Sequence, residues 1–99
     1  MTINEKMDGK VMTVILDGRL DTLSSPDLET YLEKYYPIIE KLIFDMEKVE
    51  FVSSAGLRVI LRAQHMIKGD RNTVVIRGAN KIVKAVFEVT GFTNFFTFE

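Results

Sequence analysis

The sequence predicts an α/β fold, in which helices pack on a mixed β-sheet with an antiparallel N-terminal edge and a parallel core. Two observations support this prediction. The chain begins with a hairpin signal, since residues 2–7 alternate in polarity and are followed by Asp8-Gly9, a dipeptide that favours tight turns between strands. After the hairpin, short apolar runs alternate with segments of helical periodicity, and right-handed crossovers then make the later strands parallel.

Four more strands are expected after the first. Residues 11–16 are almost continuously apolar, which is typical of a strand covered on both faces. The apolar run that ends at Phe44 predicts a buried strand, and Asp45 is expected to open a loop after it. The expected ranges of these strands are 11–16, 41–44, 73–76 and 93–98, the last at an edge of the sheet.

Three helices are expected, and their ranges are 25–36, 54–68 and 80–89. The first has a clear start, because Ser25 supplies a capping hydroxyl and Pro26 suits the first helical position. Gly69-Asp70 is expected to end the second helix. Asn80 is expected to cap the third, and Gly91 to end it.

Composition is that of an ordinary globular protein, with 46% hydrophobic and 27% charged residues among 99. We expect a single domain spanning residues 1–99. The chain has no cysteine and one histidine, which excludes disulfides, thiolate metal sites, cysteine catalysis and multi-histidine metal sites. No signal peptide is recognisable, and no apolar run approaches the ~20 residues that a membrane helix needs. The expected location is therefore the cytoplasm, without a membrane partner.

The charges are distributed unevenly along the chain. Residues 1–57 carry eleven acids and six bases, whereas residues 58–84 carry seven bases and one acid, Asp70. A nucleic-acid surface is one interpretation of the basic block. No aromatic residue is interleaved with these bases, as a stacking surface would require. We therefore interpret the block as solvated helix faces and expect no nucleic-acid partner.

Residues 45–57 are the most informative segment for function. Ser54 is expected at the start of the second helix, where its side-chain oxygen could cap backbone N–H groups that have no intrahelical partner. The same N–H groups and the positive end of the helix dipole form a natural seat for a phosphate. A second motif, residues 17–21, should lie at the same carboxyl end of the parallel strands, so that the two motifs meet in space.

The segment Asp-Met-Glu-Lys-Val-Glu-Phe-Val-Ser-Ser-Ala-Gly-Leu resembles the signature of the STAS family, the anti-sigma-factor antagonists of bacteria. That signature reads Asp-x-x-x-Val-x-Phe-x-Asp-Ser-Ser/Ala-Gly-Leu, and the serine after its second Asp is the one phosphorylated. The corresponding serine here is Ser54, while Ser53 stands where many relatives have Asp. Gly18-Arg19-Leu20-Asp21 also resembles the Gly-x-Leu/Ile-Asp that follows the second strand in the family.

The resemblance implies a STAS-like fold and a role in partner switching rather than catalysis. The unphosphorylated domain would bind an anti-sigma factor, itself a serine kinase using ATP, and free a sigma factor for transcription. Phosphorylation of Ser54 would end this binding, and a serine phosphatase would restore it. The expected protein has no cofactor, no metal and no catalytic residue, and is a monomer when free.

Five residues are candidates for contact with the partner: Asp21, Ser53, Ser54, Gly56 and Arg58. Asp21 would contact the partner or repel an added phosphate, and Ser53 could also be a rival phosphoacceptor. Gly56 could allow a close approach of the partner's backbone. Arg58 lies one turn after Ser54 and could steady a phosphate, although solvation is its commonest fate.

Other assignments explain fewer features. The main alternative is a small anion- or nucleotide-binding α/β module that uses the helix N-terminus at residues 53–56. A receiver domain lacks its adjacent acid pair, and a serine hydrolase lacks both the Gly-x-Ser-x-Gly elbow and a base within reach of Ser54, since His65 lies roughly 16 Å along the helix. A homo-oligomeric scaffold remains open because of the aromatic residues in 92–98.

Overall fold

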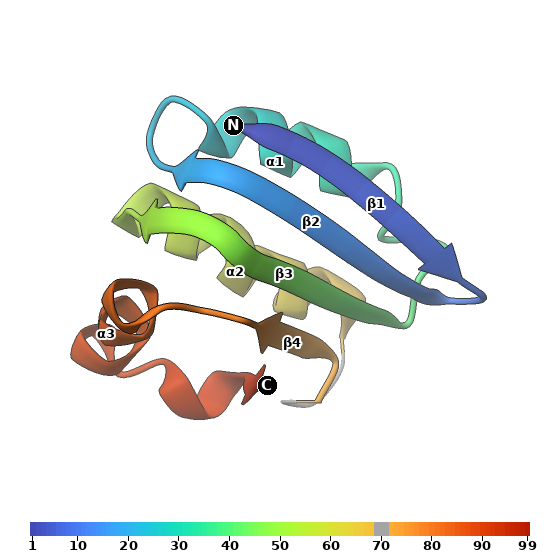
Figure 1. Cartoon of the computed structure of the whole chain (residues 1–99). Helices are drawn as coiled ribbons and strands as arrows, with labels where there is room; N and C mark the ends of the chain where they lie inside the picture. Colours follow the sequence, from blue (N-terminus) through green and yellow to red (C-terminus); the bar gives the residue numbers. More distant parts are fainter. Residues whose placement is uncertain (69–71) are drawn as a thin grey trace.

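The computed structural model of the chain describes residues 1–68 and 72–99 (Figure 1). In chain order its elements are β1 (Thr2–Asp8), β2 (Val11–Leu20), α1 (Ser25–Glu33), β3 (Lys41–Val52), α2 (Ser54–Ile67), β4 (Val74–Arg77), α3 (Lys81–Thr90), the short 3-10 helix η1 (Thr93–Phe95) and β5 (Thr97–Phe98). The strands form one sheet in the order β1-β2-β3-β4-β5. β1 is antiparallel to β2 and every other pair is parallel, which confirms the predicted mixed sheet.

The opening hairpin is confirmed, with its turn one residue later than expected. Asp8 still pairs with Val11, so Gly9 and Lys10 form the two-residue loop. Gly9 has a φ of 59°, whereas Lys10 has no positive φ, as in a type II′ turn with glycine at its first central position.

The hydrophobic core lies on one face of the sheet, where all three α-helices contribute to it. Alternate residues of β2, namely Met12, Val14 and Leu16, are completely buried in this core. Their neighbours in the strand are only partly buried, and Figure 1 views β1, β2 and β3 from a face that no helix crosses. The expectation that β2 is covered on both faces was therefore wrong. Branched side chains occupy the solvent-facing positions of this strand as well as its core-facing positions, so its sequence resembles that of a strand buried on both faces.

β3 is much longer than expected. Instead of ending near Asp45, it extends to Val52 and has twelve residues in all. It pairs with β2 as far as Leu20, which lies opposite Val52. The pairing shifts register after Ile15 and again after Gly18. These irregularities turn Val49 and Val52 into the core although charged residues interrupt the apolar pattern before them.

The helix ends differ from the expectations at α1 and agree at α3. The first helix begins at Ser25 but ends at Glu33, and its N-cap position is Ser24, which makes no side-chain capping bond. Ser25 instead donates its hydroxyl to the Asp21 carbonyl, so its prediction as the cap was wrong. The third helix is capped as predicted, since Asn80 Oδ1 accepts from the Val83 N–H at 2.8 Å.

The C-terminal ends of α2, α3 and the sheet complete the fold. Gly91, with a φ of 80°, ends α3 as predicted. Lys68 ends α2 in a left-handed conformation, and the predicted stop at Gly69-Asp70 lies outside the described residues. The expected edge strand at 93–98 is reduced to η1 and the two residues of β5.

A polar clasp joins the edge strand β1 to α1. The carboxylate of Glu5 accepts hydrogen bonds from the hydroxyls of Tyr31 at 2.5 Å and Tyr35 at 2.6 Å. These hydrogen bonds, assisted by the charge of Lys34, hold the pKa of the Glu5 carboxyl below its usual value. The clasp thus favours the ionised carboxylate and ties the hairpin to the first helix.

Candidate functional site

The site is built where β3 passes directly into α2. The cap of α2 is Ser53, whose extended backbone has φ −83° and ψ 174° and whose Oγ accepts from the Gly56 N–H at 3.3 Å. This backbone is fixed by β2, because the Ser53 N–H donates to the Leu20 carbonyl at 2.9 Å. The prediction that Ser54 caps the helix was therefore wrong, and the role belongs to its neighbour.

Ser54 is the first residue of α2, and its side chain is exposed. Within the described part of the chain its hydroxyl has no hydrogen-bond partner, whereas that of Ser53 is occupied by the cap. Two adjacent hydroxyls are thus distinguished by geometry. The hydroxyl of Ser54 faces solvent, available to a second protein, while the hydroxyl of Ser53 stabilises the helix.

Gly56 brings the two predicted motifs together. A Cβ at this position would lie 2.6 Å from Leu20 Cγ and 2.8 Å from the Leu20 carbonyl oxygen. Glycine therefore lets the first turn of α2 pack closely on the end of β2, which confirms that residues 17–21 and 45–57 meet. The close approach expected of a partner's backbone is made instead by this chain's own Leu20, and Gly56 is buried.

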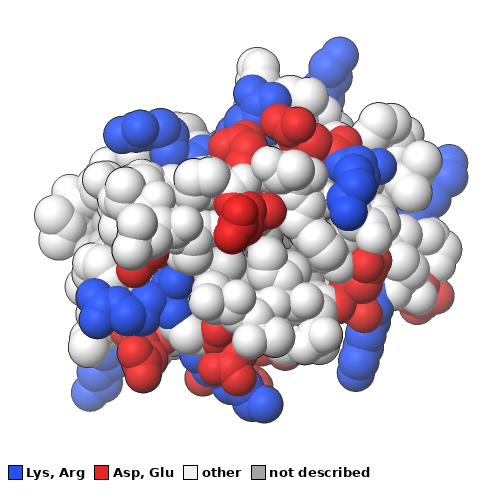
Figure 2. Space-filling view, turned by 90° about the horizontal axis from the view of Figure 1, so that it is seen from above, with Lys and Arg blue, Asp and Glu red and all other residues white. Residues whose placement is uncertain are grey.

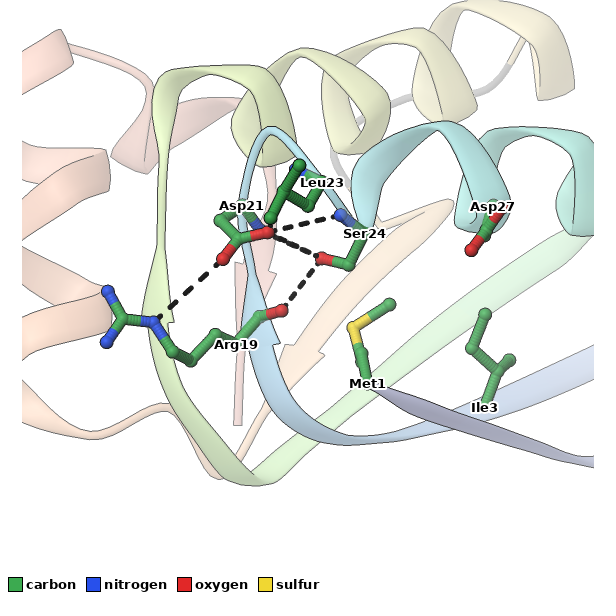
Figure 3. Close-up of a pocket in the computed structure, with 7 residues that line it drawn as sticks. All are labelled: Met1, Ile3, Arg19, Asp21, Leu23, Ser24 and Asp27. Carbon is green, nitrogen blue, oxygen red and sulfur yellow. Dashed lines mark hydrogen bonds and ion pairs between the residues drawn. The ribbon is translucent and has the colours of Figure 1, made fainter.

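Asp21 organises the loop between β2 and α1 (Figure 3). Its Oδ1 accepts from the Leu23 N–H at 3.0 Å and the Ser24 N–H at 3.1 Å, while its own N–H donates to Ser24 Oγ at 2.9 Å. The hydrogen bond from the Ser24 backbone is the largest cause that holds the pKa of Asp21 below its usual value. These hydrogen bonds therefore favour the ionised form of Asp21, and its carboxylate is turned toward its own loop.

A cavity of about 390 Å3 lies beside this loop. Arg19 forms one side of it, with Nε 4.0 Å from Asp21 Oδ2 (Figure 3). The Arg19 guanidinium also lies 5.5 Å from the centre of the Phe51 ring. Leu23 projects from the loop with 88% of its surface exposed. The cavity is mixed in character, because a cation, two acids and apolar side chains line it: Met1, Ile3, Arg19, Asp21, Leu23, Ser24 and Asp27.

The remaining candidates stand apart from this loop. Arg58 follows Ser54 by one helical turn, is exposed, and forms no ion pair within residues 1–68 and 72–99. Asp45, which was expected to open a loop, lies within β3 instead, and its Oδ1 accepts from the Glu47 N–H at 3.2 Å. Arg58 thus lies on α2 one turn after Ser54, and Asp45 lies within the strand.

An apolar groove on the other side of Ser54 was missed by the sequence analysis. It has a volume of about 340 Å3 and is lined by Phe51, Val52, Ser53, Ser54, Ala85, Val86, Val89 and Thr90. The groove arises because α3 packs beside the end of β3, held by Asn80, whose Nδ2 donates to the Val49 carbonyl at 3.1 Å. A sequence signal existed, since α3 carries more apolar residues than one buried stripe needs, with Ile82 60% and Val89 86% exposed.

Two arginines of the basic block form ion pairs within the fold. Arg62 of α2 pairs with Glu29 and Glu33 of α1, and Arg77 pairs with Glu99 at 3.5 Å. On the face seen from above, positive and negative side chains are interspersed among neutral areas (Figure 2). The ion pairs connect elements of the fold, as expected for solvated helix faces.

Neither a metal site nor a membrane-crossing helix is present among the described residues. No cluster of three or more His, Asp or Glu side chains there has the arrangement of a metal site. No helix in that part of the chain is long and apolar enough to cross a membrane.

Comparison with known proteins identifies relatives of this chain. The STAS domain family model matches residues 2–99. BtrV of Bordetella bronchiseptica, named as a candidate anti-sigma factor antagonist, is 28% identical over 93 residues, which cover 93% of this chain and 79% of BtrV.

Solved structures share the fold at low sequence identity. The unphosphorylated anti-sigma factor antagonist SpoIIAA superposes with a TM-score of 0.85 at 15% identity, covering 99% of this chain and 88% of SpoIIAA. The phosphorylated form of SpoIIAA from Bacillus superposes with a TM-score of 0.77 at 14% identity, covering 99% of this chain and 91% of that protein. An anti-sigma factor antagonist from Mycobacterium paratuberculosis superposes with a TM-score of 0.83 at 21% identity, covering 98% of this chain and 83% of that protein. The family match along almost the whole sequence shows that this chain belongs to the STAS domain family.

Proposed function

We propose that this STAS domain is an anti-sigma-factor antagonist that binds an anti-sigma factor with serine kinase activity and is released when Ser54 is phosphorylated. The observation that carries the site assignment is the contrast between two neighbouring hydroxyls. Ser54 is exposed and without a described partner, whereas Ser53 is engaged as the cap of α2. The domain acts as a binding module and a kinase substrate, and a serine phosphatase restores it. This role places it in the cytoplasm, beside the sigma factor.

The chemistry of release is local. A phosphoserine adds about −1.5 to −2 charges at neutral pH, at a contact point that was uncharged. Binding would require the partner surface to remove water from that charge, which is costly without a matching cation. Phosphate at the first turn of a helix is otherwise favourable, since the dipole is positive there and Arg58 lies one turn away. Phosphorylation should therefore block the contact without unfolding the domain.

The partner surface proposed around Ser54 includes Asp21, Ser53 and Arg58, with Gly56 beneath it. Leu20, the neighbour of Asp21, is hydrogen-bonded to Ser53, so the β2–α1 loop borders the start of α2. Arg58 extends the surface along α2. Gly56 contributes by letting α2 pack closely on β2 rather than by touching the partner.

The anion-binding alternative has less support from the backbone geometry. The N–H groups of Gly56 and Leu57 already donate to the side chain and carbonyl of Ser53, and the N–H of Ser53 donates to Leu20. Fewer donors therefore remain for a free anion than an open helix N-terminus offers. Thermal shift with nucleotides and phosphorylated metabolites should show no specific stabilisation; a clear increase in Tm without kinase binding would favour this alternative.

Phosphorylation by the anti-sigma kinase of the same genome tests the assignment. Wild type incubated with kinase and ATP should gain one phosphate, Ser54→Ala should gain none, and the matched control Ser53→Ala should still gain one. Mass spectrometry of the peptide locates the phosphate. Phosphate on Ser53, or on neither serine, would reject Ser54 as the site.

Binding of an acidic variant completes the test. Ser54→Asp should fold, because an acid is favourable at a helix N-terminus, yet bind the kinase poorly because a charge now enters the contact. Ser54→Ala should keep binding. Equal binding of Ser54→Asp and Ser54→Ala would show that charge at this position does not control release.

A further inference from the structure

We propose that the apolar groove between the end of β3 and α3 receives an apolar side chain of the anti-sigma kinase and anchors it while Ser54 is phosphorylated. This inference rests on the proposed function and adds a docking site to it. The groove residues are Phe51, Val52, Ser53, Ser54, Ala85, Val86, Val89 and Thr90.

The position of the groove determines its occupant. Ser54, the proposed phosphoacceptor, is itself part of the groove wall. A kinase must bring its catalytic groups to within about 3 Å of the hydroxyl that it phosphorylates. Its surface around the ATP site therefore lies over the groove whenever Ser54 is in position to react, and α3 becomes part of the contact.

The chemistry of the wall favours an apolar side chain. None of the eight groove residues is charged. The hydroxyl of Thr90 is turned back to its own helix, donating to the Val86 carbonyl at 2.6 Å, and the hydroxyl of Ser53 caps α2. Ser54 thus supplies the only wall hydroxyl without a partner among the described residues, at one end of an apolar surface.

Exposure of the groove wall supports the same conclusion. Val89 is 86% exposed, although it lies beside the packed residue Val86 rather than at a chain end. An inserted apolar side chain would bury this surface, whereas a phosphate on Ser54 would place charge at the rim of the same groove and oppose the insertion.

Kinetics with the purified anti-sigma kinase of the same genome test the groove. Val89→Lys should fold, because the residue is exposed and a cation is favourable near a helix C-terminus. It should raise KM for the domain by about ten-fold or more, the amount expected when burial of one valine side chain is lost, and leave kcat nearly unchanged. Ile38→Lys is the matched control, since Ile38 is 58% exposed and precedes β3, at the end of the strand opposite Ser53.

A label at the groove gives a second readout. Because the chain has no cysteine, Val89→Cys and Ile38→Cys each provide a unique position for an environment-sensitive dye. Kinase binding should shift the emission of the dye at residue 89 to the blue and leave the dye at residue 38 unchanged. Prior phosphorylation of Ser54 should abolish the shift.

The outcomes separate this inference from the proposed function. A kinase that phosphorylates wild type, Val89→Lys and Ile38→Lys with the same KM would overturn the groove and leave the function standing. A kinase that neither binds nor phosphorylates wild type would reject both. A dye shift at residue 89 that grows with protein concentration alone would assign the groove to a second copy of the chain and overturn the inference.

Discussion

Ser53 and Ser54 show how one bond to a neighbouring strand assigns different roles to identical side chains. The hydrogen bond from the Ser53 N–H to the Leu20 carbonyl holds Ser53 in the extended conformation of an N-cap. Ser54 is then the first helical residue, with its hydroxyl exposed. Sequence alone could not distinguish the two, because serine is favourable at either position and the deciding bond is made by a residue more than thirty positions earlier.

The stability of single variants should follow this assignment. Ser53→Ala removes the cap bond to the Gly56 N–H and should lower the free energy of unfolding by about 1 kcal/mol. Ser54→Ala removes no hydrogen bond within the described residues and should change it by less than about 0.5 kcal/mol. Urea denaturation of both variants beside wild type measures the difference. A larger loss in Ser54→Ala than in Ser53→Ala would contradict the observed cap.

At the scale of elements, strand and helix order was predictable while strand length was not. Apolar runs predicted the central parts of β2 and β3. The continuation of β3 to Val52 was not predicted, because Glu47, Lys48 and Glu50 interrupt the apolar pattern there. That continuation depends on pairing with β2 through two register shifts, which no local pattern records. The apolar groove escaped prediction for a similar reason, since it forms only when α3 docks beside the end of this extended strand.

The clasp between β1 and α1 should make stability depend on pH in the acid range. The folded pKa of Glu5 is lowered from 4.5, chiefly by the hydrogen bonds from Tyr31 and Tyr35. A lowered carboxyl pKa contributes stability that is fully present above the unfolded value and is lost as pH falls through the folded value. Wild type should therefore lose this contribution as pH falls below 4.5.

Glu5→Gln provides the matching variant, because it keeps the shape of the side chain and removes its charge. Wild type should have a higher free energy of unfolding than Glu5→Gln near neutral pH, about pH 7. This difference in free energy should shrink as the pH falls into the acid range. Urea denaturation across this range measures it. A difference that stays constant with pH would mean that the clasp acts through packing alone and would contradict the role of the carboxylate.

For the whole molecule, the uncovered face of the sheet raises the question of self-association. Its central residues Ile43 and Val75 lie outside the main core cluster, yet they are only 9% and 2% exposed. In the cross-strand register Lys6 stands beside Thr13 and Asp45 beside Arg77, so long polar side chains border this apolar centre. The low exposure of Ile43 and Val75 shows that the chain itself already covers this apolar centre. Lysine and arginine stems commonly cover apolar surface in this way.

We accordingly expect the free protein to be a monomer. The large apolar side chains that are well exposed among the described residues belong to loops, helices and the ends of the sheet rather than to this face: Met1, Met7, Leu23, Ile38, Met66, Ile82, Val89 and Phe95. Sedimentation velocity across a wide concentration range should show a single monomeric species for wild type. Thr13→Lys, on the uncovered face, and Val89→Lys, at the groove, should sediment as wild type does. A dimer that Thr13→Lys dissociates would show that a second copy covers the sheet, whereas one that only Val89→Lys dissociates would place the second copy at the groove, where it would compete with the kinase.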